Sequence, residues 1–200
     1  MIRLITTTIL ILTVSVLAAQ TKDKTIFVGN VISDTTTFKR NNDRAAMTSI
    51  LRSKNKIEIR FITSPSFRNP NYTILTYNEK WNAKHFYYKP GTDSIMSKDI
   101  NNIMNFEIVF SQLVNNNIFS LPDQKSLKTG KYTYNPETNE LIGSLVATAD
   151  GTCYYIEFKV GDRYRRYGYC NPDCYANFYP VCELRDFVNI VGIFNELTKE

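Results

Sequence analysis

Four cysteines lie in the last quarter of the chain, and two of them are placed for a disulfide. Gly161 and Asp162 separate two aromatic segments, and both residue types tolerate the positive φ of a two-residue hairpin turn. Cys153 lies as far before that turn as Cys170 lies after it. A hairpin therefore places the two thiols opposite each other at a non-hydrogen-bonded pair, where side chains approach closely. We predict a Cys153–Cys170 disulfide there.

The two remaining cysteines leave the connectivity open. Cys174 and Cys182 are predicted to pair across a short loop that contains Pro180. Four cysteines allow three connectivities, and the main rival joins Cys170 to Cys174 and Cys153 to Cys182. The spacing of the last three cysteines is also tolerable for zinc. The motif lacks the paired knuckles of zinc sites, however, and we predict no metal.

Catalytic chemistry has few candidates in this sequence. His85 is the only histidine, and it lies in an aromatic stretch typical of a structural strand position. The carboxylates are scattered, the densest set being Asp150, Glu157, Asp162 and Asp173. The chain has no Gly-x-Ser-x-Gly elbow, phosphate loop or dinucleotide fingerprint. We therefore assign no catalytic residue and expect no cofactor, and we keep as the alternative an unrecognised secreted hydrolase that uses His85 or a carboxylate pair.

Basic and aromatic residues alternate just after the predicted hairpin turn. Tyr164 lies among Arg163, Arg165 and Arg166. Tyrosine rings and guanidinium groups can stack on, and hydrogen-bond to, a sugar, a peptide or a single nucleic-acid strand. We predict these four residues as a ligand-binding set, and the ordinary alternative is a solvated hairpin tip. On the same hairpin Glu157 lies opposite Arg166, which predicts a cross-strand ion pair.

The elements that must position these residues follow an α+β pattern. Clean period-2 alternation over residues 56–62 predicts a strand. Further strands are predicted over residues 26–32, 72–77, 81–88, 141–148, 154–160 and 163–169. Helices with one apolar face are predicted over residues 100–114, capped by Ser97 or Asp99, and 184–197, with a weaker one over 41–51. Residues 118–121 should pack under the core. We predict an antiparallel sheet covered by two helices.

The same order of elements occurs in both halves of the chain. Residues 71–90 align with residues 153–172 without a gap, which places Tyr72 on Tyr154 and Pro90 on Pro172. This favours a tandem βββα repeat with halves 56–117 and 141–198. The alternative is that any two tyrosine-rich hairpins look alike.

The first nineteen residues have the layout of a secretory signal peptide. Arg3 precedes an apolar run over residues 4–17, and Ala18 and Ala19 supply the small residues of a cleavage site. We predict that residues 20–200 form a single exported domain, secreted or periplasmic, without stable membrane insertion after cleavage. An oxidising compartment suits the predicted disulfides. The formal net charge of +5 is too small to favour nucleic acid as a partner.

Three segments carry a resemblance to known proteins. DGTCYYIEF (residues 150–158), YCNP (residues 169–172) and NIFSLP (residues 117–122) resemble segments of uncharacterised secreted proteins of the Bacteroidota. The resemblance implies an exported bacterial protein and transfers no activity.

Together these observations predict an exported, non-catalytic module that binds a protein, peptide or glycan through its sheet face or a hairpin tip. The hydrolase described above is the first alternative. A structural component of a larger envelope assembly is the second, and a large exposed apolar patch would indicate it.

Overall fold

The computed structural model describes residues 49–66, 69–92, 94–100, 105–127, 131–144, 148 and 150–199. The predicted signal peptide, the predicted strand over residues 26–32 and most of the predicted helix over residues 41–51 lie outside these ranges. The described chain begins with a single 3-10 turn, η1 (Ile50–Arg52).

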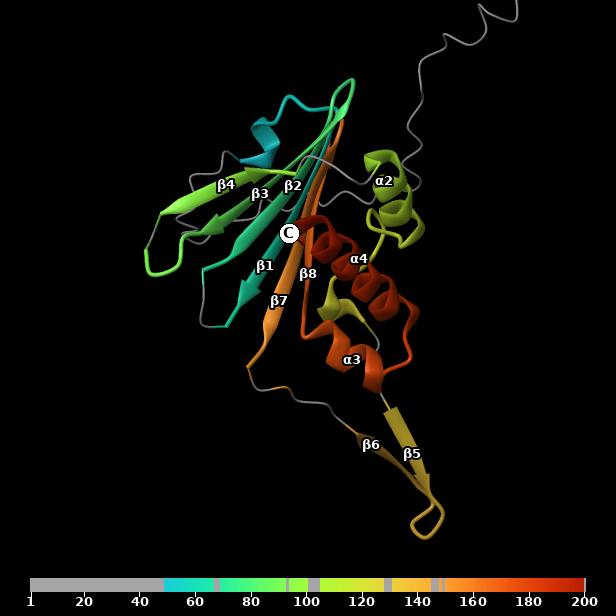
Figure 1. The fold of residues 1–200 in the computed structure, drawn as a ribbon. Helices are drawn as coiled ribbons and strands as arrows, with labels where there is room; N and C mark the ends of the chain where they lie inside the picture. The colour runs from blue at the N-terminus through green and yellow to red at the C-terminus, as the bar shows by residue number, and fades with distance from the viewer. Residues whose placement is uncertain are drawn as a thin grey trace, which may run out of the picture.

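A six-stranded antiparallel sheet forms the body of the molecule, with the strand order β4-β3-β2-β1-β7-β8 (Figure 1). Its strands are β1 (Ile57–Pro65), β2 (Asn71–Tyr77), β3 (Trp81–Tyr88), β4 (Ile95–Asp99), β7 (Thr152–Val160) and β8 (Arg163–Cys170). Strand β1 pairs with β2 on one side and with β7 on the other, so the two halves of the chain meet at the centre of the sheet.

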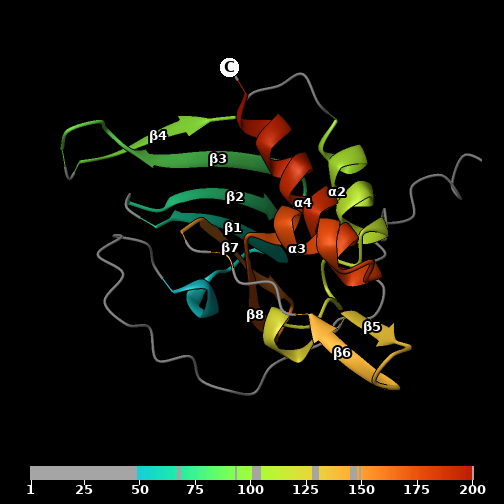
Figure 2. The same ribbon diagram turned by 90° about the horizontal axis from the view of Figure 1, so that it is seen from below.

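In the described part of the chain, three helices lie on one side of this sheet (Figure 2): α2 (Phe106–Asn115), α3 (Pro172–Phe178) and α4 (Cys182–Thr198). The contacts are aromatic: the ring of Phe194 on α4 stacks 4.5 Å from that of Phe61, and Phe187 stacks 4.0 Å from Tyr169. The α+β class and the helix-covered antiparallel sheet are thus confirmed. Among the residues described, no helix is long and apolar enough to span a membrane.

The boundaries of the first predicted helix were wrong. Residues 95–99, which include both predicted caps, form the edge strand β4 and pair with β3. The observed helix α2 begins at Phe106 because the side chain of Asn105 accepts a hydrogen bond from the backbone N–H of Glu107 at 2.9 Å. The second predicted helix is confirmed inside α4.

A short helix, α3, begins at Pro172 directly after β8. Proline has a fixed φ that suits the first position of a helix, and α3 begins there. Asn171 precedes it in the left-handed region, with φ of 50°. Its side chain holds this corner by accepting a hydrogen bond from the Thr152 N–H at 3.1 Å and donating one to Thr148 Oγ1 at 2.6 Å.

The apolar side chains of the segment that follows α2 are buried in the core, as predicted. Ile118, Phe119 and Leu121 are buried. The buried hydroxyl of Tyr167 donates to the Ile118 carbonyl at 2.6 Å, and that of Tyr169 donates to the carbonyl of the adjoining proline at 2.9 Å. Burial raises the pKa of both phenols above the usual value, so both remain neutral donors.

The structure does not show the tandem βββα repeat. Strand β6 (Glu140–Ser144), which falls within the expected first strand of the second half, pairs with β5 (Lys131–Asn135) in a separate two-stranded sheet. The two aligned hairpins also differ by one residue in register, because Tyr72 lies opposite Phe86 whereas Tyr154 lies opposite Tyr169. Their pairing with β1 also differs: Tyr72 lies opposite Ile62 on the face away from the helices, while Tyr154 lies opposite Thr63 and stacks on the helix-facing Phe61.

Candidate interaction surface

The hairpin of β5 and β6 stands away from the body of the molecule (Figure 1). Its loop is fixed by two local hydrogen bonds: the Glu137 N–H donates to Asn135 Oδ1 at 3.0 Å, and the Tyr134 hydroxyl donates to Asn139 Oδ1 at 2.8 Å. Asn139 adopts a positive φ of 56°, a conformation that asparagine tolerates. The turn therefore sets the register of the two strands.

That register gathers apolar side chains on one face of the hairpin. Tyr134 lies opposite Leu141 and Tyr132 lies opposite Gly143, and directly opposed residues share a face. The exposed fractions of Tyr132, Tyr134 and Leu141 are 67%, 54% and 68%. Gly143 gives the Tyr132 ring room to lie flat, because a Cβ at Gly143 would approach the ring to 3.3 Å. We call these four residues the apolar face of the hairpin.

The opposite face of the hairpin is more polar but also carries an exposed aliphatic side chain. Thr133 pairs with Ile142, whose exposed fraction is 51%. Four of the seven large hydrophobic side chains that are exposed in the described residues therefore lie in this one hairpin. An isolated two-stranded hairpin is marginally stable in water, and clustered exposed apolar side chains mark interaction sites.

Side chains cover one edge of the main sheet. Gln124, in the 3-10 turn η2 (Gln124–Ser126), accepts from the Cys170 N–H at 2.7 Å and donates to the Cys170 carbonyl at 3.2 Å. The neighbouring Asp123 accepts from the Gly168 N–H at 3.3 Å. These side chains occupy backbone groups of the edge strand β8 that could otherwise pair with a foreign strand.

The four predicted ligand-binding residues are not brought onto one surface. Alternation along β8 directs Arg163 and Arg165 to the helix side and Tyr164 and Arg166 to the other side. Arg165 is only 6% exposed, with its guanidinium 5.1 Å from the centre of the Tyr167 ring. The interleaving of basic and aromatic residues therefore serves two different faces of the sheet.

A row of alternating charges crosses the face of the sheet away from the helices. The Glu58 carboxylate accepts from Arg60 Nε at 2.7 Å and from Asn55 Nδ2 at 2.8 Å. Arg60 lies 3.9 Å from Glu157, and the predicted pair of Glu157 with Arg166 is confirmed at 3.2 Å. Glu58 and Arg60 are buried, so each charge is neutralised by a neighbour, as buried ion pairs require. We assign this row a structural role.

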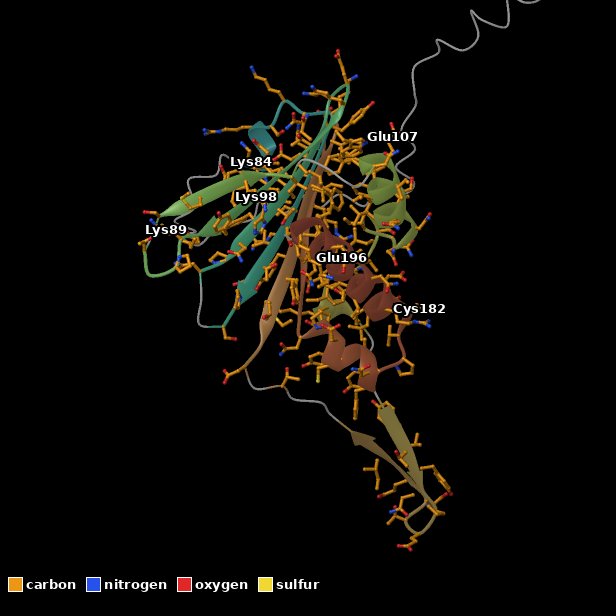
Figure 3. All side chains as sticks on the ribbon, in the orientation of Figure 1. Lys84, Lys89, Lys98, Glu107, Cys182 and Glu196 are labelled. Carbon is orange, nitrogen blue, oxygen red and sulfur yellow. A yellow bond between two sulfur atoms is a disulfide. The ribbon has the colours of Figure 1, made fainter. Side chains whose placement is uncertain are left out.

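The predicted Cys153–Cys170 disulfide is present, with the two residues paired in the expected register and their Cα atoms 3.9 Å apart. The predicted second bridge is not formed. Cys174 and Cys182 are exposed free thiols on separate helices, because part of the expected loop forms α3. Figure 3 shows Cys182 at the start of α4. Cys182 Sγ instead accepts a hydrogen bond from Arg185 Nη2 at 3.4 Å. Within the described ranges, no three metal-ligating side chains gather at one place.

The catalytic candidates are spread over four places. His85 is half-buried, with Nδ1 3.0 Å from Thr73 Oγ1 and its ring stacked 5.7 Å from that of Tyr87. Burial and the nearby Lys98 lower the pKa of His85. The carboxylate candidates separate: Asp150 and Asp173 line a surface groove of about 430 Å³, which is also lined by Tyr154 and Cys174. Glu157 belongs to the charged row, and Asp162 lies in the β7–β8 turn.

Sequence reasoning overlooked the residues of the hairpin. A signal was available, since residues 131–135 read Lys-Tyr-Thr-Tyr-Asn and place a tyrosine at every second position before the turn-forming Pro136.

Comparison with protein-family models and with curated proteins gives no match to this chain.

Proposed function

We propose that this chain is an exported, non-catalytic interaction module that binds a protein partner through the β5–β6 hairpin. The observation that supports the proposal is the exposure of Tyr132, Tyr134 and Leu141 together on one face of a projecting two-stranded sheet. Tyrosine is enriched at the energetic centres of protein interfaces because it combines a large apolar ring with a hydroxyl. Burial of this face against a partner removes the cost of its exposure to water.

The expected contribution of one tyrosine is large enough to measure. Tyr134 is 54% exposed, so contact with a partner removes about 100 Å² of its surface from water. At about 25 cal/mol per Å², this is worth about 2.5 kcal/mol, or about 60-fold in Kd. Tyr134→Ser should weaken binding by that order and leave the thermal stability of the body nearly unchanged, since the side chain packs on no part of the core cluster.

The test compares the full exported chain with two variants as baits in an envelope fraction of the cells that produce it. Tyr134→Ser is the test variant. Ile108→Ser is the matched control, because Ile108 is 57% exposed on α2 and lies outside the hairpin. Specific bands should be lost with the first variant and retained with the second. Equal recovery of the specific bands with both variants would show that the hairpin is not the binding surface.

Export is supported by the first nineteen residues, by the Cys153–Cys170 disulfide and by the resemblance to secreted proteins of the Bacteroidota. The mature chain should begin at Ala19 or Gln20. Intact-mass measurement of the product recovered outside the cytoplasm checks this, and a product that retains residues 1–18 contradicts it.

A second candidate function, a hydrolase using a carboxylate pair, is favoured only by the groove that Asp150 shares with Asp173. Asp173 contributes, after burial, to raising the pKa of Tyr154, so the groove has some electrostatic coupling. If a hydrolytic activity exists there, Asp173→Asn should abolish it and Tyr134→Ser should not. An activity insensitive to Asp173→Asn would exclude this pair.

A further inference from the structure

We infer that the partner is a different protein with an apolar groove that contacts both faces of the β5–β6 hairpin, rather than a second copy of this chain. The inference rests on the proposed function and specifies its partner. It follows from where the exposed apolar side chains lie, from how much surface they present and from the charge near the tip of the hairpin.

Exposed aliphatic and aromatic side chains occur on both faces of the hairpin. Tyr132, Tyr134 and Leu141 share the apolar face, whereas Ile142 projects from the opposite one. A flat partner surface can cover only one of these faces, because side chains on the two faces of a β-sheet point in opposite directions. A groove with two walls covers both.

The area of the apolar face argues against a symmetric pair of hairpins. Three large side chains, exposed by half to two thirds, present about 300–400 Å² of surface. Face-to-face packing of two copies would bury that area on each copy. This is less than half of the roughly 800 Å² per partner that stable interfaces bury. Insertion of the whole hairpin into a groove adds the second face and both strand edges to the buried surface.

Edge-to-edge pairing of two copies does not cover the exposed apolar side chains either. Joining two hairpins through their strand edges satisfies backbone groups, but it leaves side chains perpendicular to the sheet in water. Tyr132, Leu141 and Ile142 would stay largely exposed in such a pair, because a neighbouring strand covers only their sides. Backbone pairing with a second copy therefore gives no account of why these residues are apolar.

The charge near the tip of the hairpin predicts a basic rim on the groove of the partner. Glu137 and Glu140 are exposed beside the loop, on a chain whose formal net charge is positive. Two carboxylates at the leading end oppose insertion of the hairpin into an anionic lipid surface, whereas a basic rim at the end of a protein groove matches them. We therefore assign the surface to a protein partner rather than to a membrane.

The experiment places a photo-cross-linking residue, p-benzoylphenylalanine, on each face of the hairpin in the full exported chain. The two positions are Tyr134 and Ile142, and the control position is Ile108 on α2. After irradiation in the native envelope, both hairpin positions should give an adduct with the same polypeptide, and the control should not. Peptide mapping should place the two sites of attachment on facing walls of one region of that polypeptide.

Each other outcome separates this inference from the proposed function. Adducts from Tyr134 alone overturn the two-walled groove and leave the hairpin as the binding surface. A cross-linked product that contains only this chain, at twice the mass of the exported chain, shows self-association and overturns the inference of a different partner. Adducts with lipid overturn the assignment to a protein partner. No adduct from either hairpin position overturns both the inference and the proposed function.

Discussion

Removal of the Cys153–Cys170 disulfide should destabilise the protein without changing its fold. The bridge joins residues 17 positions apart at the base of the β7–β8 hairpin. In the chain-entropy account, a closed loop of this length is worth about 3 kcal/mol at 25 °C. For a domain of this size, 3 kcal/mol corresponds to a fall in Tm of about 6–12 °C. We expect that fall in the Cys153→Ser/Cys170→Ser variant.

The assay is thermal unfolding followed by circular dichroism, with the parent chain kept oxidised. Cys174→Ser/Cys182→Ser is the matched control, since it also replaces two cysteines but removes no bridge. Its Tm should stay within about 2 °C of the parent, as for surface substitutions. Equal Tm values for the two variants would refute the reasoning, because they would show that the hairpin base is held without the bridge. A far-ultraviolet spectrum that differs from that of the parent would refute the claim that the fold is retained.

Three further predictions concern other parts of the molecule. Under native, non-reducing conditions, two thiols per chain should react with Ellman's reagent, and four should react after reduction and unfolding; fewer than two native thiols would mean that the second bridge forms. Gly192→Ala, at an open helix position, should stabilise the protein by about 1 kcal/mol. Gly168→Ala should destabilise it by about 1–3 kcal/mol, because the new Cβ would lie 2.3 Å from the Tyr155 ring. Chemical denaturation of the two variants checks that the changes in unfolding free energy have opposite signs. Burial lowers the pKa of His85 in the folded state below its usual value of 6.5, so the unfolded chain binds more protons and the folded state loses stability as the pH drops through 6.5. The His85→Gln variant should therefore lose less stability than the parent between pH 7 and pH 5. Equal losses in the two proteins would contradict this.

The β7–β8 hairpin could be predicted in detail because its determinants are local. Gly161 and Asp162 set the turn, the turn sets the register, and the register places Cys153 opposite Cys170. The same reasoning placed Glu157 opposite Arg166. Local alternation and turn chemistry were sufficient for every one of these pairs.

Other parts of the fold depend on information that is not local. Residues 97–99 carry polar side chains typical of a helix start, yet residues 95–99 form an edge strand because β3 offers them a partner. The strand within residues 141–148 was recognised, but its pairing with β5 instead of the main sheet could not be read from its own pattern. For the same reason the sequence showed alternating tyrosines at 132 and 134 but not that both are exposed.

Charge interleaving on β8 gave an incomplete picture of the candidate site. A period of two distributes neighbouring residues to opposite faces, so Arg165 and Arg166 cannot serve one surface while both lie in a regular strand. Only the packing of the helices against one face shows that Arg165 is buried and that Arg166 belongs to the row of ion pairs.

The central position of β1 has a consequence for how the chain acquires its structure during synthesis. Strand β2 follows β1 after a short connection and pairs with it along one edge, but the other edge pairs with β7, whose residues are made about ninety positions later. A β-meander of β1 to β4 therefore emerges first with the hydrogen-bonding groups of β1 unpaired, beside apolar side chains such as Ile59 and Phe61. Such high-contact-order pairing is slow, and an unpaired strand edge invites association with other chains. The unpaired edge of β1 is thus the part of this meander most open to association with other chains until β7 pairs with it.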